Sequence, residues 1–60
     1  MDRERHGDYW FVVNLIAAGP EPIWQWKVYR DPGGRVVGID RADSEDAARQ
    51  AARAWIAKQS

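Results

Sequence analysis

Apolar and polar positions form three strand-like patterns in the first part of the chain. They span residues 8–16, 23–30 and 35–39. Each segment is rich in aromatic and β-branched side chains, which favour β-strands. Pro20 and Pro22 interrupt the chain after the first segment, which predicts an exposed loop. The run Asp31-Pro32-Gly33-Gly34 predicts a tight hairpin, so we expect the second and third segments to pair in antiparallel fashion.

The remaining segment changes to the period of an α-helix. Either Asp43 or Ser44 can cap its first turn, and Glu45 and Asp46 suit the positive end of the helix dipole. One helical face gathers small apolar side chains and a single ring: Ala47, Ala48, Ala51 and Trp55, flanked by Ala52 and Ile56. Because most side chains on this face are small, the helix can approach a sheet closely, and the sheet must then supply the large side chains of the core.

These elements predict an α+β fold, a three-stranded antiparallel β-meander packed on one carboxy-terminal helix. We expect residues 8–60 to form a single domain and residues 1–7 to be a flexible amino-terminal tail. A chain of 60 residues buries a small core, so its stability is expected to be modest.

Alternation with period two assigns the strand residues to two faces of the sheet. The face toward the helix is expected to carry Phe11, Val13 and Leu15, then Trp24, Trp26 and Val28, then Val37 and Ile39. Gly38 then points outward, where it leaves room for a neighbouring ring or marks a bulge. The opposite face is predicted to expose more apolar area than a lone small domain needs, which is typical of an interaction surface. Its candidate residues are Trp10, Val12, Gln25, Lys27, Tyr29 and Val36. The alternative is that the tail or the long loop folds over part of this face.

Composition narrows the classes of function. Nine basic and nine acidic side chains give no net charge, which argues against gripping nucleic acid by bulk charge. The chain has no cysteine and one histidine, so disulfides and the common structural zinc sites are excluded. The charged amino terminus and the short apolar run at 9–18 predict neither a signal peptide nor a membrane segment, and a cytoplasmic location is expected.

No group of side chains predicts catalysis. His6 lies in the charged tail without a positioned partner, and Ser44 has no histidine arranged to activate it. A carboxylate cluster lacks the spacing of a calcium loop, and helix capping accounts for part of it: Asp40, Asp43, Glu45 and Asp46. We therefore expect no enzymatic activity, no metal, no cofactor and no small-molecule substrate.

Three segments are similar to a known DNA-binding fold. They are Trp26-Lys27-Val28-Tyr29-Arg30-Asp31-Pro32, Gly34-Arg35-Val36-Val37-Gly38 and Ser44-Glu45-Asp46-Ala47-Ala48. Together they resemble the AP2-type domain and the related amino-terminal domains of tyrosine integrases, in which a three-stranded sheet backed by one helix lays its open face into the major groove. The resemblance implies nucleic-acid contacts at Lys27, Arg30 and Arg35, with Trp10 and Tyr29 as stacking groups. The segment 9–16 departs from those families because it contains no arginine.

Two functions are consistent with these observations. The first is a small interaction module that binds a protein partner, or a second copy of itself as a homodimer, through the open sheet face or a sheet edge. The second is DNA binding through the same face, which would weaken steeply with salt. We favour the first because the predicted face is more apolar than basic.

Overall fold

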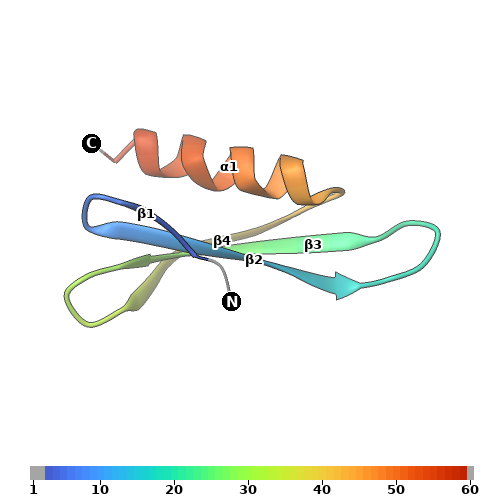
Figure 1. Ribbon diagram of the computed structural model, residues 1–60, viewed down its shortest axis with the longest axis horizontal. Coiled ribbons are helices and arrows are strands. Elements are labelled where there is room, and N and C mark those ends of the chain that lie inside the picture. The colour runs from blue at the N-terminus through green and yellow to red at the C-terminus, as the bar shows by residue number, and fades with distance from the viewer. Residues whose placement is uncertain (1–2, 60) are drawn as a thin grey trace.

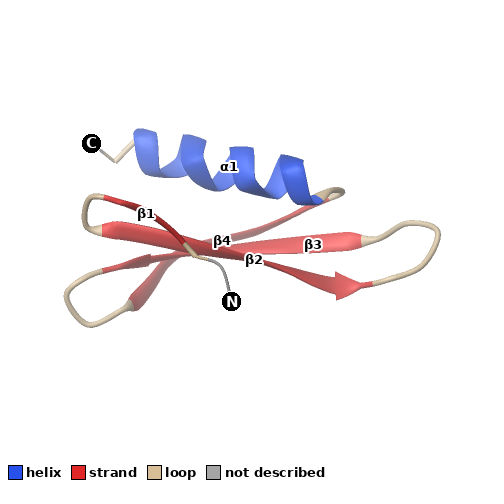
Figure 2. Ribbon diagram, viewed as in Figure 1, coloured by secondary structure: helices blue, strands red, loops and turns tan. Residues whose placement is uncertain are grey.

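A single antiparallel sheet lies beneath one carboxy-terminal helix in the computed structural model, which describes residues 3–59 (Figures 1 and 2). The strands are β1 (Glu4–His6), β2 (Tyr9–Ala17), β3 (Ile23–Arg30) and β4 (Arg35–Ala42), and the helix is α1 (Glu45–Ala57). The strands neighbour one another in chain order. The predicted α+β class and the single terminal helix are confirmed, but the sheet has four strands rather than three.

The additional strand is β1, which forms from residues expected to belong to a flexible tail. Glu4, Arg5 and His6 pair with Phe11, Trp10 and Tyr9. Gly7 begins the connecting turn with φ of 63°, a conformation that glycine adopts without strain. The flexible tail predicted for residues 1–7 is therefore wrong for residues 4–6, while residues 1 and 2 lie outside the described part of the chain, as does residue 60.

The β3–β4 hairpin forms as predicted, but β4 runs on to Ala42 and contains a bulge. Val28 lies opposite Gly38 and Tyr29 lies opposite Val36, so Val37 is an extra residue in the ladder. An inserted residue moves every later side chain to the other face of the sheet. Gly38 therefore faces the helix. Ile39, which was expected in the core, lies opposite Lys27 on the far face and is 54% exposed.

The core lies between α1 and the facing side of β2 and β3. Its buried residues are Phe11, Trp26, Val28, Ala48, Ala52 and Ile56. The buried stripe of the helix thus centres on Ala48, Ala52 and Ile56, slightly rotated from the predicted face, and Trp55 packs at its margin. Ala48 and Ala52 are fully buried, so the helix contributes mainly methyl groups to the core and the sheet supplies the large rings of Phe11 and Trp26.

The hairpin of β2 and β3 extends beyond the start of α1 (Figure 1). Leu15 and Trp24 lie opposite each other near this end. Leu15 was expected in the core, yet it is 47% exposed because the helix does not cover it. Within residues 3–59, no helix is long and apolar enough to cross a membrane.

Candidate interaction face

The side of the sheet turned away from α1, which we call the outer face, is built from cross-strand rows. Register places Arg5, Trp10, Tyr29 and Val36 in one row, Val12, Lys27 and Ile39 in the next, and Asn14, Gln25 and Arg41 in the third. All the residues predicted for the candidate interaction face lie here. Val12 offers little contact area, however, because it is only 8% exposed.

Trp10 and Tyr29 form the centre of the first row. Their rings stack with centroids 4.1 Å apart and planes 8° from parallel. The guanidinium carbon of Arg3 lies over the Trp10 ring, 4.7 Å from its centroid. Since Tyr29 already occupies one side of the indole at contact distance, the guanidinium must lie on the other. The indole is held between a cation and a second ring, an arrangement that restricts its motion and leaves it half-buried.

Arg3, which belongs to the predicted amino-terminal tail, thus covers the outer face at Trp10. The alternative considered from the sequence, that the amino-terminal segment folds over this surface, is realised at Trp10. Elsewhere on the face Val36 and Ile39 remain 45% and 54% exposed.

Asp31 closes the row at the β3–β4 turn. Its carboxylate accepts hydrogen bonds from Arg5 Nη1 at 3.0 Å and from Trp10 Nε1 at 3.5 Å. The hydrogen bond from Arg5 is the main cause that holds the pKa of Asp31 below its ordinary value. These contacts position the indole and neutralise part of the charge of Arg5.

The cations of the outer face come from three strands and the residue before β1. They are Arg3, Arg5, Lys27 and Arg41. Within residues 3–59, neither Lys27 nor Arg41 forms an ion pair. Several acids lie elsewhere: Glu4 bonds to Arg53 of the helix, and Asp43, Glu45 and Asp46 lie around the helix start. A chain without net charge therefore has a basic outer face.

Of the three basic residues that the family resemblance implies as nucleic-acid contacts, Lys27 alone lies on the outer face, together with the implied stacking groups Trp10 and Tyr29. Arg30 and Arg35 lie opposite each other at the end of the β3–β4 hairpin, and Arg30 approaches the ring of Tyr9, 5.6 Å from its centroid. The sequence pattern does not place Arg3 and Arg5 on this face, because residues 1–7 show no strand-like alternation. It does not place Arg41 there either, because the third strand-like segment ends at residue 39. A three-residue strand has too few positions to show a period.

On the opposite side of the sheet, Glu4 and His6 of β1 face the helix. Arg53 donates to both carboxylate oxygens of Glu4 at 2.7 Å, and His6 contacts the same carboxylate. Hydrogen bonding to Arg53, followed by that to His6, lowers the pKa of Glu4 to about 2. The His6 ring stacks on Phe11 with centroids 6.2 Å apart. These contacts attach β1 to the helix and the core.

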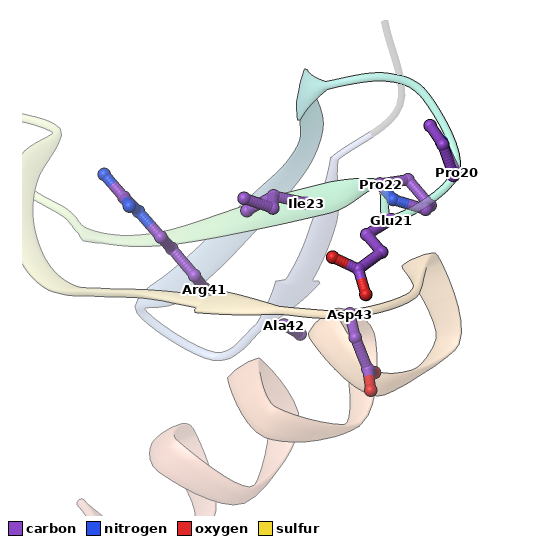
Figure 3. A pocket seen from close by; sticks show the side chains of 7 residues that line it. All are labelled: Pro20, Glu21, Pro22, Ile23, Arg41, Ala42 and Asp43. Carbon is purple, nitrogen blue, oxygen red and sulfur yellow. The ribbon is translucent and has the colours of Figure 1, made fainter.

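A shallow hollow of about 670 Å³ lies beside the loop between β2 and β3 (Figure 3). Its lining consists of Pro20, Glu21, Pro22, Ile23, Arg41, Ala42 and Asp43. In Figure 3, the carboxylate of Glu21 lies near Asp43, whereas Arg41 extends away from both. Among residues 3–59, no group of three or more histidine, cysteine or acidic residues could hold a metal ion. The hollow is open and its one cation, Arg41, points away from the two acids, so it provides no converging set of polar groups for a small substrate.

Comparison with known proteins does not add a relative. No protein-family model, curated protein or solved structure matches this chain. The resemblance to AP2-type and integrase domains therefore stays a prediction.

Proposed function

We propose that this protein is a non-enzymatic interaction module whose outer face binds an acidic and partly apolar polypeptide. The observation that supports the proposal is the combination of unpaired cations with exposed β-branched side chains on one face. Lys27 and Arg41 lie in the same rows as Ile39 and Gln25. A partner with acidic and apolar side chains would pair the cations and remove the apolar surface from water.

The aromatic pair suits a protein interface. Trp10 and Tyr29 are held by stacking, by Arg3 and by Asp31, so little side-chain entropy is left to lose on binding. Tyrosine, tryptophan and arginine are also the residue types that contribute most to binding energy at protein interfaces. This row would serve as a rigid anchor, with Val36 beside it as an exposed apolar contact.

The charge of the outer face disfavours self-association through it. Two copies meeting face to face would bring Lys27 and Arg41 of one copy against the same cations of the other. Like charges brought together at an interface cost several kcal/mol. An acidic partner has the complementary charge and meets no such penalty.

DNA binding is the second candidate, and the same cations beside an aromatic pair favour it. Two features weigh against it. Trp10 is already enclosed by Tyr29 and Arg3, so a base could stack on it only after one of them moved. The exposed side chains of Val36 and Ile39 have no evident role against phosphates.

Titration of isotope-labelled protein distinguishes the two candidates. The probes are a random copolymer of glutamate and tyrosine, polyglutamate alone, and a short duplex DNA, each at about 50 mM and about 200 mM salt. We expect the copolymer to shift the amide signals of Lys27, Tyr29 and Val36 and to bind more tightly than polyglutamate. Absence of outer-face shifts with the copolymer would contradict the proposal. Tighter binding of the duplex at both salt concentrations would favour the second candidate.

Charge reversal at matched positions locates the binding surface. Lys27→Glu places an acid in the middle row of the outer face, and we expect it to weaken copolymer binding by about tenfold. Lys58→Glu makes the same change in charge at the end of the helix, and we expect an effect of at most about twofold because the helix lies on the other side of the sheet. Equal weakening by both variants would show that only overall charge matters, which would refute a role for this face.

A further inference from the structure

The edge of β2 beyond β1 is open. β1 pairs only with residues 9–11 of β2, whereas β3 pairs along the other side from Tyr9 to Ala17. Within residues 3–59, no strand covers residues 12–17 on the β1 side. Backbone donors and acceptors on such an edge are available to another strand.

This edge lacks the charged side chains that protect most sheet edges. β4, at the opposite edge, carries Arg35, Asp40 and Arg41, and charges of this kind discourage the addition of a strand. β2 has no charged residue over its whole length. Its uncovered part includes Leu15 and Ile16, which are 47% and 44% exposed. Of the two edges, β2 is the one suited to extension.

We propose that a second copy of this chain adds to the β2 edge in antiparallel fashion and makes the sheet continuous across a homodimer. In this dimer the helices of both copies lie on the same side of the continuous sheet. Two-fold symmetry then requires residues of the same face to lie opposite each other. A register centred on Leu15 meets this condition over residues 14–16, with Asn14 of one copy opposite Ile16 of the other. The bulge at Ile16 turns Ala17 to the other face and ends the pairing there. This register also leaves Tyr9 to Phe11 free for β1. The two Leu15 side chains then meet across the axis on the helix side, where α1 does not cover them.

The chemistry of the edge favours a second copy over the acidic partner proposed for the outer face. The paired segment, residues 14–16, has no cation to attract an acid and no charge to repel its own copy. Each copy supplies the same exposed Leu15 side chain and the same unpaired backbone donors and acceptors. Each copy therefore provides the hydrogen-bond partners and the apolar contact that the other lacks. In this dimer the two outer faces lie side by side and remain open, which makes the inference independent of the proposed function.

Sedimentation tests the dimer with two matched variants. The wild type is expected at twice the monomer mass, and Leu15→Lys at the monomer mass, because it places two like charges on the axis. Ile39→Lys changes a residue of similar exposure on β4 and is expected to leave the dimer intact. A wild type that sediments as a monomer at high concentration would refute the proposal, as would a Leu15→Lys variant that remains dimeric.

Cross-linking provides a test that does not depend on a destabilising substitution. The chain has no cysteine, and residues directly opposite on antiparallel strands lie within disulfide range. Oxidised Leu15→Cys should therefore form a covalent dimer, whereas oxidised Ile39→Cys should stay largely monomeric. If both variants cross-link to the same extent, or if Leu15→Cys does not cross-link, the β2 edge is not the interface. Copolymer binding by Leu15→Lys should persist, so failure of the dimer is distinguishable from failure of the proposed function.

Discussion

Gly38 has no side chain, and this lets the Trp55 ring of the helix pack directly against β4 at the edge of the sheet. A Cβ atom at this position would lie 2.8 Å from Cε2 of Trp55, well inside contact distance. The Trp55 ring also meets Tyr9 edge to face, with centroids 6.0 Å apart, so it is held from a second direction. Glycine at position 38 therefore provides the space in which the indole lies against β4.

Gly38→Ala is expected to lower the free energy of unfolding by about 1–3 kcal/mol, because the added methyl group overpacks this contact. A smaller gain from reduced freedom of the unfolded chain opposes this loss. Urea denaturation measures the net effect. In a double-mutant cycle, Trp55→Leu should relieve the cost of Gly38→Ala. Unchanged stability of Gly38→Ala would mean that Trp55 does not pack on this part of β4.

The Glu4 carboxylate makes stability depend on acid pH. Its pKa falls from 4.5 to about 2 in the folded chain, mainly through its hydrogen bonds with Arg53. A lowered folded pKa means that the unfolded chain binds the proton more tightly, so the contribution is present above about 4.5 and is lost as the pH falls toward about 2. We expect Glu4→Gln to lower the urea midpoint near neutral pH and to match the wild type near the lower value. A difference in urea midpoint between Glu4→Gln and the wild type that is equal at both ends of this pH range would argue against the pairing of Glu4 with Arg53.

At the scale of elements, a few side-chain contacts hold β1 in place and fix the start of α1. β1 has only three residues and is held from several sides, by Arg53 through Glu4 and by Asp31 through Arg5. The start of α1 depends on Ser44, whose hydroxyl accepts a hydrogen bond from the Ala47 N–H at 3.1 Å. The sequence allowed either Asp43 or Ser44 as the cap, and the structure selects Ser44.

Ser44→Ala should reduce stability by about 1 kcal/mol, since it leaves a first-turn N–H without its partner. Ser44→Asp should retain most of the stability because a carboxylate can accept the same bond. Asp43→Ala serves as the matched control and is expected to change little. Thermal unfolding of the three variants provides the comparison, and a larger loss in Asp43→Ala than in Ser44→Ala would show that the cap is assigned to the wrong residue.

At the scale of the whole molecule, the chain has no net charge, but its charged side chains are distributed unevenly and the outer face has more cations than acids. The outer face gathers Arg3, Arg5, Lys27 and Arg41, while Asp43, Glu45 and Asp46 lie around the start of the helix. The proposed dimer would place two such outer faces on the same side of one continuous sheet. A long acidic chain could then contact both copies at once.

This arrangement predicts an avidity effect. Oxidised Leu15→Cys, as a covalent dimer, should bind a long glutamate-tyrosine copolymer about 10²-fold more tightly than the monomeric Leu15→Lys, because the second contact becomes intramolecular. A copolymer too short to reach both faces should show no such difference per site. Fluorescence anisotropy with labelled copolymers measures both affinities. Equal binding of the long copolymer by the two variants would mean that the outer faces do not act together.

Local signals in the sequence determined most of the fold. Turn residues at 31–34 predicted the β3–β4 hairpin, alanine and a cap predicted α1, and alternation placed Phe11, Trp26 and Val28 in the core. Each of these features depends on residues close in sequence or on a period that repeats along an element. The sequence also placed every residue of the candidate interaction face on the side away from the helix, because β2 as far as Leu15, β3, and the part of β4 before its bulge keep a regular alternation.

Only the tertiary structure decided which residues complete the two surfaces. Pairing of β1 with β2, the bulge at Val37 and the position of Arg41 all depend on contacts between strands, and none leaves a periodic signal in its own segment. The bulge moved Gly38 inward and Ile39 outward, and β1 brought Arg3 and Arg5 onto the outer face while leaving the rest of the β2 edge open. Composition fixes the total charge of a chain, but the face on which each charge lies is set by register, which is a property of paired strands.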